Sequence, residues 1–196
     1  EPLVAAACEV KNGRIESQTW HFPEGIKGYF ANAIDDLDPV ATTFFGERYI
    51  AAESESESFA EGEGALWAIA WTPEGDSVGE SYVNMIPTRH GGTHVAGLRE
   101  GIYHAIRNFI DHHAMGQRGL KIVPEDVWSR TSYVLAVKML DPQFKGQVKN
   151  ELISRDGVKL VSQMVRDPFE LWLSQHVDEG RKIAELVIRQ AMARTR

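Results

Sequence analysis

The sequence predicts an α/β protein in which helices back a sheet and a helical arm follows at the C-terminus. Short apolar runs bounded by Gly, Pro and Asn predict the strands. From Thr93 to about Met115, apolar residues recur in steps of three and four, which predicts a long amphipathic helix lying on the sheet. The C-terminal third of the chain is also expected to be helical, with a helix start signal at Asp167.

Composition narrows the class of protein. The chain has 196 residues, 43% of them hydrophobic and 25% charged, which is typical of a globular protein of one or two domains. No apolar run approaches the roughly 20 residues that cross a bilayer. A single cysteine, Cys8, favours a reducing, cytosolic setting. The chain opens without methionine and ends in a helical pattern, so we expect both ends to continue in a longer protein.

Charge is divided unevenly along the chain. Residues 1–80 hold 4 basic and 16 acidic residues, whereas residues 81–196 hold 17 basic and 12 acidic residues. Because polyanions bind surfaces of positive potential, this division favours a polyanionic partner for the second part. A solvated surface on which charges are merely segregated explains the pattern equally well.

The first elements expected are a hairpin and a helix. The apolar run Leu3–Val10, the turn sequence Asn12-Gly13 and the returning stretch Arg14–Phe22 predict the β-hairpin. A helix is expected over Glu24–Ile34, where apolar residues recur every four positions.

Four more strands are expected, at Tyr49–Phe59, Ala65–Trp71, Ser77–Ile86 and Thr131–Met139. Thr131–Met139 is largely apolar on both faces, which is typical of a central strand. The repeat Glu53–Ser58 alternates acid and serine, and we expect a solvated edge strand or a mobile loop there.

Local signals also suggest where the helices begin. A glycine pair precedes Thr93, which we expect to be an N-cap, and a short helix is expected near Pro124. Asp167-Pro168-Phe169-Glu170 combines an N-cap acid with proline at the first helical position, so a helix start is expected there.

The last helix is expected to begin at about Asp178. Three basic residues occur in it at intervals of seven positions. Lys182, Arg189 and Arg196 would therefore lie on one helical face, about 10 Å apart along the axis.

Motifs for a self-contained catalytic or metal site are missing from the sequence. It has no G-x-x-x-x-G-K-[ST] phosphate loop, and Gly62-Glu63-Gly64 lacks the third glycine of a dinucleotide fingerprint. His90 and His94 have the spacing of two ligands on a helix, but the glycine pair between them opposes a helix. We expect surface or capping histidines, no metal site and no Ser-His-Asp set.

The loop Asp141–Lys149 is the strongest candidate for a functional site. It follows the expected central strand, so a rigid element would carry it. In an extended segment, Gln147 and Lys149 would leave the same face, and an amide beside an ammonium can hold a terminal phosphate. An ordinary solvated turn explains the same residues.

Two motifs are specific enough to suggest a family. One is I-P-x-x-x-G-G-T-H over Ile86–His94, and the other is Asp141-Pro142-Gln143-Phe144 followed by Gln147-Val148-Lys149. Together with Trp20–Ile26, they resemble the B subunit of the bacterial type IIA DNA topoisomerases. In 132–138 the resemblance is closer to the topoisomerase IV branch than to the gyrase branch.

The resemblance covers about 3–196 and implies the transducer domain of that subunit. Residues 1–21 would be the terminal strands of the upstream ATP-binding domain, 22–177 the transducer, and 178–196 a helix leading toward the DNA-cleavage domain. The implied fold is like that of a ribosomal-protein domain, with helices layered on a mixed sheet and a left-handed βαβ crossover. Handedness rules alone favour the right-handed form, found in about 98% of cases.

The resemblance also implies a function. The family's Q-T-K loop reaches the ATP pocket, where its lysine contacts the terminal phosphate; Gln147 and Lys149 match it, and Val148 replaces the usual Thr. The complete subunit would use ATP and Mg²⁺ for DNA relaxation and decatenation, or for supercoiling in the gyrase branch. This chain alone would bind neither and be inactive.

The implied partners are the ATP-binding domain, a second B subunit, the A subunit in a heterotetramer, and duplex DNA lying along Lys182, Arg189 and Arg196. No membrane partner is implied, and the location would be cytoplasmic, at the nucleoid. Two other classes stay open. A free-standing phosphotransferase would need its own phosphate loop, and a nucleic-acid-binding or structural module would act without catalysis. The net charge of −7 argues for weak DNA binding by this chain alone.

Overall fold

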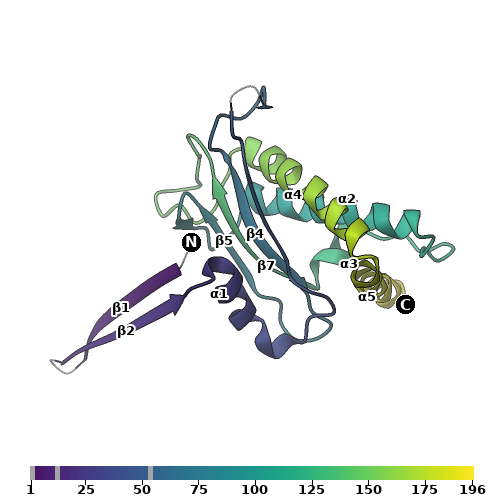
Figure 1. Cartoon of the computed structure of the whole chain (residues 1–196), viewed down its shortest axis with the longest axis horizontal. Coiled ribbons are helices and arrows are strands. Elements are labelled where there is room, and N and C mark those ends of the chain that lie inside the picture. The colour runs from purple at the N-terminus through teal and green to yellow at the C-terminus, as the bar shows by residue number, and fades with distance from the viewer. Residues whose placement is uncertain (1–2, 12–13, 53–54) are drawn as a thin grey trace.

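The structure, a computed structural model, describes residues 3–11, 14–52 and 55–196, with side chains described from residue 21 onward. A β-hairpin is followed by a five-stranded sheet with helices on both faces (Figure 1). Within those residues, none of the helices combines the length and the apolar character needed to cross a membrane.

The hairpin pairs β1 (Leu3–Lys11) with β2 (Arg14–Phe22) in antiparallel register. The predicted hairpin is therefore confirmed, while its predicted turn, Asn12-Gly13, lies outside the described residues. β2 leads into α1 (Gly25–Ala33), also as predicted. The ring of Phe22 packs edge-on against that of Tyr29, with 5.3 Å between centroids, and so joins the end of the hairpin to this helix.

The sheet has the strand order β3-β4-β7-β5-β6, with β7 in the centre as predicted. β7 pairs antiparallel with β4 and parallel with β5, so the sheet is mixed and the predicted α/β class is confirmed. The strands are β3 (Phe44–Tyr49), β4 (Gly64–Trp71), β5 (Gly79–Val83), β6 (Ile86–Pro87) and β7 (Thr131–Lys138).

A parallel strand pair needs a crossover connection. Here α2 (Thr93–His112) and α3 (Pro124–Trp128) connect β5 to β7. The left hand of this crossover stays a prediction. The chain closes with α4 (Asp156–Gln175) and α5 (Val177–Arg194). Figure 1 shows α2 and α4 side by side on one face of the sheet, with α1 on the other.

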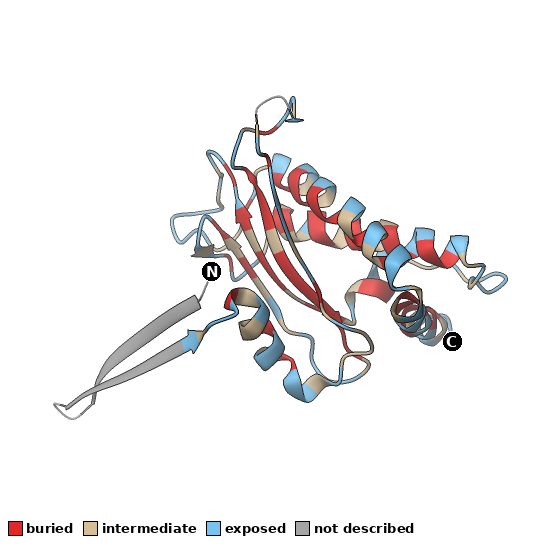
Figure 2. Ribbon diagram, in the orientation of Figure 1, coloured by how far each residue is buried: buried red, intermediate tan, exposed pale blue. Residues whose placement is uncertain are grey.

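Alternation along β4 divides the core into two clusters. Trp67, Ile69 and Trp71 belong to the large cluster that faces α2, α4 and α5. Ala68 and Ala70 belong to the small cluster under α1. Large aromatic side chains fill the wide helical layer, whereas small ones let the short helix come close to the strands. Figure 2 shows the buried residues along the strands and on the inner sides of the helices.

Two predicted strands differ from the structure. The strand expected at Tyr49–Phe59 is wrong, because β3 ends at Tyr49, opposite the first residue of β4, Gly64. The described residues between Tyr49 and Gly64 belong to no strand, because their alternating acids and serines leave no continuous apolar face to bury. The strand expected at Ser77–Ile86 is interrupted by a turn at Asn84 and Met85, which both have positive φ. β5 and β6 consequently form an antiparallel pair.

α4 begins at Asp156, well before the expected start at Asp167, and Pro168 lies inside it. Proline has no N–H, so the helix loses one backbone hydrogen bond at this position. Apolar side chains before and after the proline are buried, and the free energy gained by burying them exceeds the cost of the lost hydrogen bond. The helix therefore continues through Pro168 although the local sequence signals a helix start there. The buried residues of the helix include Leu160, Val161, Met164, Val165, Phe169 and Leu173.

The N-cap of α2 is Gly92, not Thr93 as predicted, and no side chain caps this helix. The N–H of Thr93 instead donates to the carbonyl of Leu152 at 3.0 Å. A distant segment of backbone therefore satisfies one of the free amides of the helix start, a role that local sequence cannot reveal.

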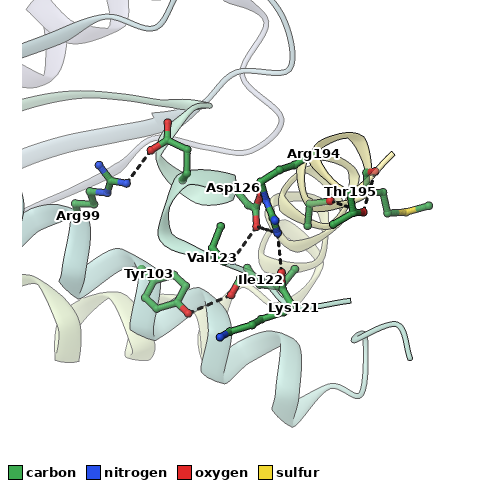
Figure 3. A network of polar contacts seen from close by, with 11 residues as sticks. Arg99, Tyr103, Lys121, Ile122, Val123, Asp126, Arg194 and Thr195 are labelled. Carbon is green, nitrogen blue, oxygen red and sulfur yellow. Dashed lines mark hydrogen bonds and ion pairs between the residues drawn. The ribbon is translucent and has the colours of Figure 1, made fainter. Parts of the chain in front are cut away.

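A buried carboxylate fastens the end of α5 to α3 (Figure 3). Asp126 is 2% exposed and accepts hydrogen bonds from Arg194 Nε at 2.8 Å and Nη2 at 3.1 Å. It also accepts the N–H of Val123 at 2.8 Å, which caps α3. Arg194 Nη2 donates as well to the carbonyl of Lys121 at 2.8 Å. This contact holds the last turn of α5 against α3.

Substitution of Asp126 tests the strength of this contact. We expect Asp126→Ala to lower the free energy of unfolding by about 2–3 kcal/mol, because the helix cap and the acceptor of the arginine fork are both lost. Glu125→Ala is the matched control, since Glu125 pairs with Arg99 at 2.7 Å but is 59% exposed; a pair so exposed contributes at most about 1 kcal/mol. Urea unfolding followed by tryptophan fluorescence measures both variants. Equal losses would contradict a special role for Asp126.

Candidate functional site

The loop that follows β7 is itself a small hairpin. The N–H of Lys145 donates to the carbonyl of Glu151 at 2.9 Å, and that of Ile153 donates to the carbonyl of Gln143 at 2.8 Å. The side chains of Lys145 and Glu151 form an ion pair at 3.2 Å across the same stem. These bonds leave 146–150 between the two sides of the stem. Because the carbonyl of Asn150 is bonded outside the hairpin, to the N–H of His90, the tip is formed by the four residues 146–149.

The tip carries both residues of the predicted phosphate contact, but not in extended form. Gln147 and Val148 form a turn, and Gly146 and Lys149 have φ values of 71° and 56°. The expectation that Gln147 and Lys149 share one face of an extended segment is therefore wrong, because a four-residue tip must reverse the chain direction. All of these side chains are exposed, and Lys149 Nζ lies 5.7 Å from the ring centroid of Phe144.

The base of this hairpin is bonded to the start of α2. The carbonyl of Asn150 accepts the N–H of His90 at 2.9 Å. The N–H of Leu152 donates to the carbonyl of Gly91 at 3.0 Å, and the carbonyl of Leu152 accepts the N–H of Thr93. The glycine-rich motif and the loop, which sequence analysis identified separately, therefore meet in one site.

A buried polar group lies beneath this contact. Thr88 Oγ1 donates to the carbonyl of Ser81 at 2.9 Å and lies 2.9 Å from His94 Nε2. With the Thr88 proton assigned to the Ser81 carbonyl, Nε2 of His94 is assigned as the donor to Thr88 Oγ1, and Nδ1 of His94 has no partner among the described residues. His94 is fully buried, and burial lowers its pKa from 6.5 to about 4. The imidazole is therefore neutral at physiological pH.

Two side chains that the sequence did not indicate as functional bond to the backbone where the loop begins, directly after β7. Asn84 Nδ2 donates to the carbonyl of Met139 at 2.8 Å, and its Oδ1 accepts the Met139 N–H at 3.0 Å. Glu63 accepts the N–H of Leu140 at 2.7 Å. A turn signal at Asn84 was available, because asparagine tolerates positive φ. Its partner Met139, which directly follows β7, was not readable from sequence.

The candidate metal ligands do not converge. His94 is buried, whereas His90 is exposed. Among the residues that the structure describes, no three or more His, Cys, Asp or Glu side chains gather as a metal site would require.

The cations expected along the last helix are only partly aligned. Lys182 and Arg189 are exposed on α5, with Glu185 exposed between them. Arg196 lies beyond the helix, which ends at Arg194, so its expected place on the same face is wrong. The hydroxyl of Thr195 donates to the carbonyl of Ala191 at 3.0 Å, which closes the last turn.

The fold and the loop define a class of protein found in the ATPase regions of type II topoisomerases. The solved "Topoisomerase iv atp binding domain of francisella tularensis" matches 92% of this chain and 46% of its own, with TM-score 0.73 and 34% identity. The 43K ATPase domain of Thermus thermophilus gyrase B matches 97% of this chain and 49% of its own with TM-score 0.76; at 18% identity, it shows the fold alone.

The chain belongs to the DNA gyrase B family, whose profile matches residues 25–196. The B subunit of DNA topoisomerase 4 from Pseudomonas aeruginosa is 42% identical over 196 residues, which are 97% of this chain and 29% of that protein. The Escherichia coli K12 protein of the same name is 42% identical over 180 residues, 91% of this chain and 27% of that protein. These relatives favour topoisomerase IV over gyrase, as predicted, and this chain spans less than a third of their length.

The buried histidine makes stability depend on pH. An unfolded histidine takes up a proton below about pH 6.5, whereas folded His94 stays neutral until about pH 4. We therefore expect its contribution to the free energy of unfolding to be complete above pH 6.5 and to fall by about 3 kcal/mol as the pH drops toward 4.

Denaturant unfolding between pH 7 and pH 4 measures this effect. His94→Gln keeps an N–H donor but does not titrate, so its stability should fall less steeply than that of the wild type. Curves that stay parallel would show that His94 does not cause the loss.

Proposed function

We propose that this chain is the transducer segment of the B subunit of a topoisomerase IV-type enzyme, which couples ATP binding and hydrolysis to closure of a DNA clamp. In this proposal, residues 1–21 complete the ATP-binding domain, 22–177 form the transducer and 178–196 lead toward the cleavage domain. The observation that carries the proposal is an exposed lysine at the tip of a hairpin whose stem is bonded to the start of α2.

Lys149 and Gln147 suit contact with the terminal phosphate of ATP held by the neighbouring domain. Lys149 is exposed and makes no ion pair with a described residue, and its Nζ lies 5.7 Å from the centroid of the Phe144 ring, so its ammonium is available to an anion. A lysine supplies a mobile point charge, and an amide can orient an oxygen or a water. Both side chains leave one four-residue tip, so they can reach the same group although they do not share an extended strand. Val148 is 75% exposed and has no role in the stem.

In this proposal, the complete subunit binds ATP with Mg²⁺, and this ATP supplies the terminal phosphate that Lys149 contacts. Its binding and hydrolysis change the relative free energies of two arrangements of the domains. The ammonium of Lys149 favours the arrangement in which it meets that phosphate, because a ligand shifts an equilibrium only through contacts that differ between the states. The hairpin stem passes this preference to α4, which begins at Asp156. The proposed partners are a second B subunit, the A subunit and duplex DNA, at the bacterial nucleoid.

Lys182 and Arg189 are proposed to face the transported DNA duplex. They are exposed on α5 and lie two helical turns apart, about 10 Å, so both can reach phosphates without reading bases. Arg196 would extend this basic surface beyond the helix.

Removing the lysine amine tests the proposed phosphate contact. We expect Lys149→Ala in the complete subunit to lower kcat for ATP hydrolysis by about tenfold or more, because a charge-assisted contact is lost. Lys145→Ala is the control, since Lys145 lies in the same hairpin but pairs with Glu151. Steady-state phosphate release measures both. ATPase rates like those of the wild type in Lys149→Ala would remove the proposed contact.

Charge reversal tests the proposed DNA contact. We expect Lys182→Glu with Arg189→Glu to weaken DNA stimulation of the ATPase and to flatten its dependence on salt, because each lost cation reduces counterion release. Reversal of Arg196 should add a smaller effect. The control reverses Lys27 and Arg48, two exposed cations on α1 and β3. Equal responses to salt in the two double variants would exclude a specific DNA role for α5.

A further inference from the structure

Three short segments form a ladder at the base of the Lys149 hairpin. Segment 150–153 lies in the middle, bonded on one side to 90–93 and on the other to 143–145. The bridge to Gly92 is parallel and the bridge to Phe144 is antiparallel. Lys149 directly precedes the middle segment, so any displacement of that segment moves the lysine.

Gly92 permits the close approach on which this ladder depends. A Cβ at this position would lie 2.2 Å from the carbonyl oxygen of Leu152 and 2.5 Å from its nitrogen. These are backbone atoms, which cannot turn aside as a flexible side chain can. Gly92 also has φ 133°, a region that residues with a side chain rarely adopt.

Buried side chains next to the 90–93 segment fix its position. The side chain of Thr88 bonds to Ser81 of β5 and to His94 of α2, and all three are buried. On the side of α4, Gly157 leaves room for the side chain of Thr93. A Cβ on Gly157 would lie 2.5 Å from Thr93 Oγ1. The start of α2 is therefore enclosed between β5 and α4, and gives the ladder a rigid support.

We infer that Gly92 is a positioning residue for Lys149, acting through the backbone of Leu152, and that Thr88 supports it through His94. This inference rests on the proposed contact between Lys149 and phosphate. A reacting group displaced by about 1 Å can lose on the order of 100-fold in rate, so the small shift that a methyl group imposes is enough to be measured.

The test uses Gly92→Ala in the complete subunit. We expect kcat for ATP hydrolysis to fall by about 10- to 100-fold. Two glycine controls separate positioning from general damage. Gly116→Ala adds a methyl group where no atom lies within 4 Å. Gly97→Ala places one 2.4 Å from the carbonyl of Val158 on α4, where the three nearest atoms all belong to Val158 and none to the ladder. Gly116→Ala should keep the rate of the wild type, and Gly97→Ala should lower stability more than kcat.

A double-mutant cycle with Lys149→Ala gives the decisive readout. If Gly92 acts through the lysine amine, Gly92→Ala should lower kcat no further once Lys149 is alanine. Independent, multiplicative losses would overturn the inference. Should Gly92→Ala fail to fold, Thr88→Val takes its place in the same cycle, because it removes the hydroxyl and keeps the shape of the side chain.

Hydrogen exchange separates this inference from the proposed function. In Gly92→Ala, the amides of Lys145, Leu152 and Ile153 should exchange faster, since they close the ladder. Unchanged exchange at these amides would refute the positioning role, whatever the ATPase shows. If exchange rises while Lys149→Ala leaves the ATPase intact, the ladder is real and the phosphate contact is the part that fails.

Discussion

The approach of Gly92 to the backbone of Leu152 is the constraint on which the candidate site depends. It lets the start of α2 and the segment after Lys149 share a ladder of backbone hydrogen bonds. Backbone atoms within bonding distance allow little adjustment, so two segments far apart in sequence hold one geometry. The part of the loop outside this ladder is thereby reduced to the four-residue tip that carries the lysine.

The two ends of the molecule are joined by a rigid helical layer. In Figure 1, α2 and α4 run from the side of the β7 loop toward the side where α3 and α5 lie. Gly97 of α2 leaves no room for a Cβ against Val158 of α4, so these helices meet at backbone distance. At the far end, Asp126 and Arg194 hold the last turn of α5 (Figure 3). A packed layer of this kind resists internal deformation, which suits the proposed relay of a signal between neighbouring domains.

Sequence patterns identified most of the fold where periodicity and turn chemistry agreed. The hairpin, α1, β4, α2 and the central β7 have strong local signals, and each is present. The failures came where burial outweighed local preference. Pro168 signals a helix start, yet it lies inside α4 because apolar residues on both sides of it are buried. The stretch after Tyr49 alternates as a strand does, but among its described residues only Ile50 and Phe59, at its two ends, are buried, so it has no continuous buried face and leaves the sheet.

By itself, the sequence determined the α/β class and the family resemblance, and it pointed to Gln147 and Lys149 as the residues of the proposed phosphate contact, because these inferences depend on residue types in a short span. Only the tertiary structure decided how the site is built. The turn of the tip, the neutral buried His94 and the bonds from Asn84 to Met139 all depend on segments separated by many residues. Local sequence records the preference of each segment, but which distant backbone it meets is decided by packing of the whole core.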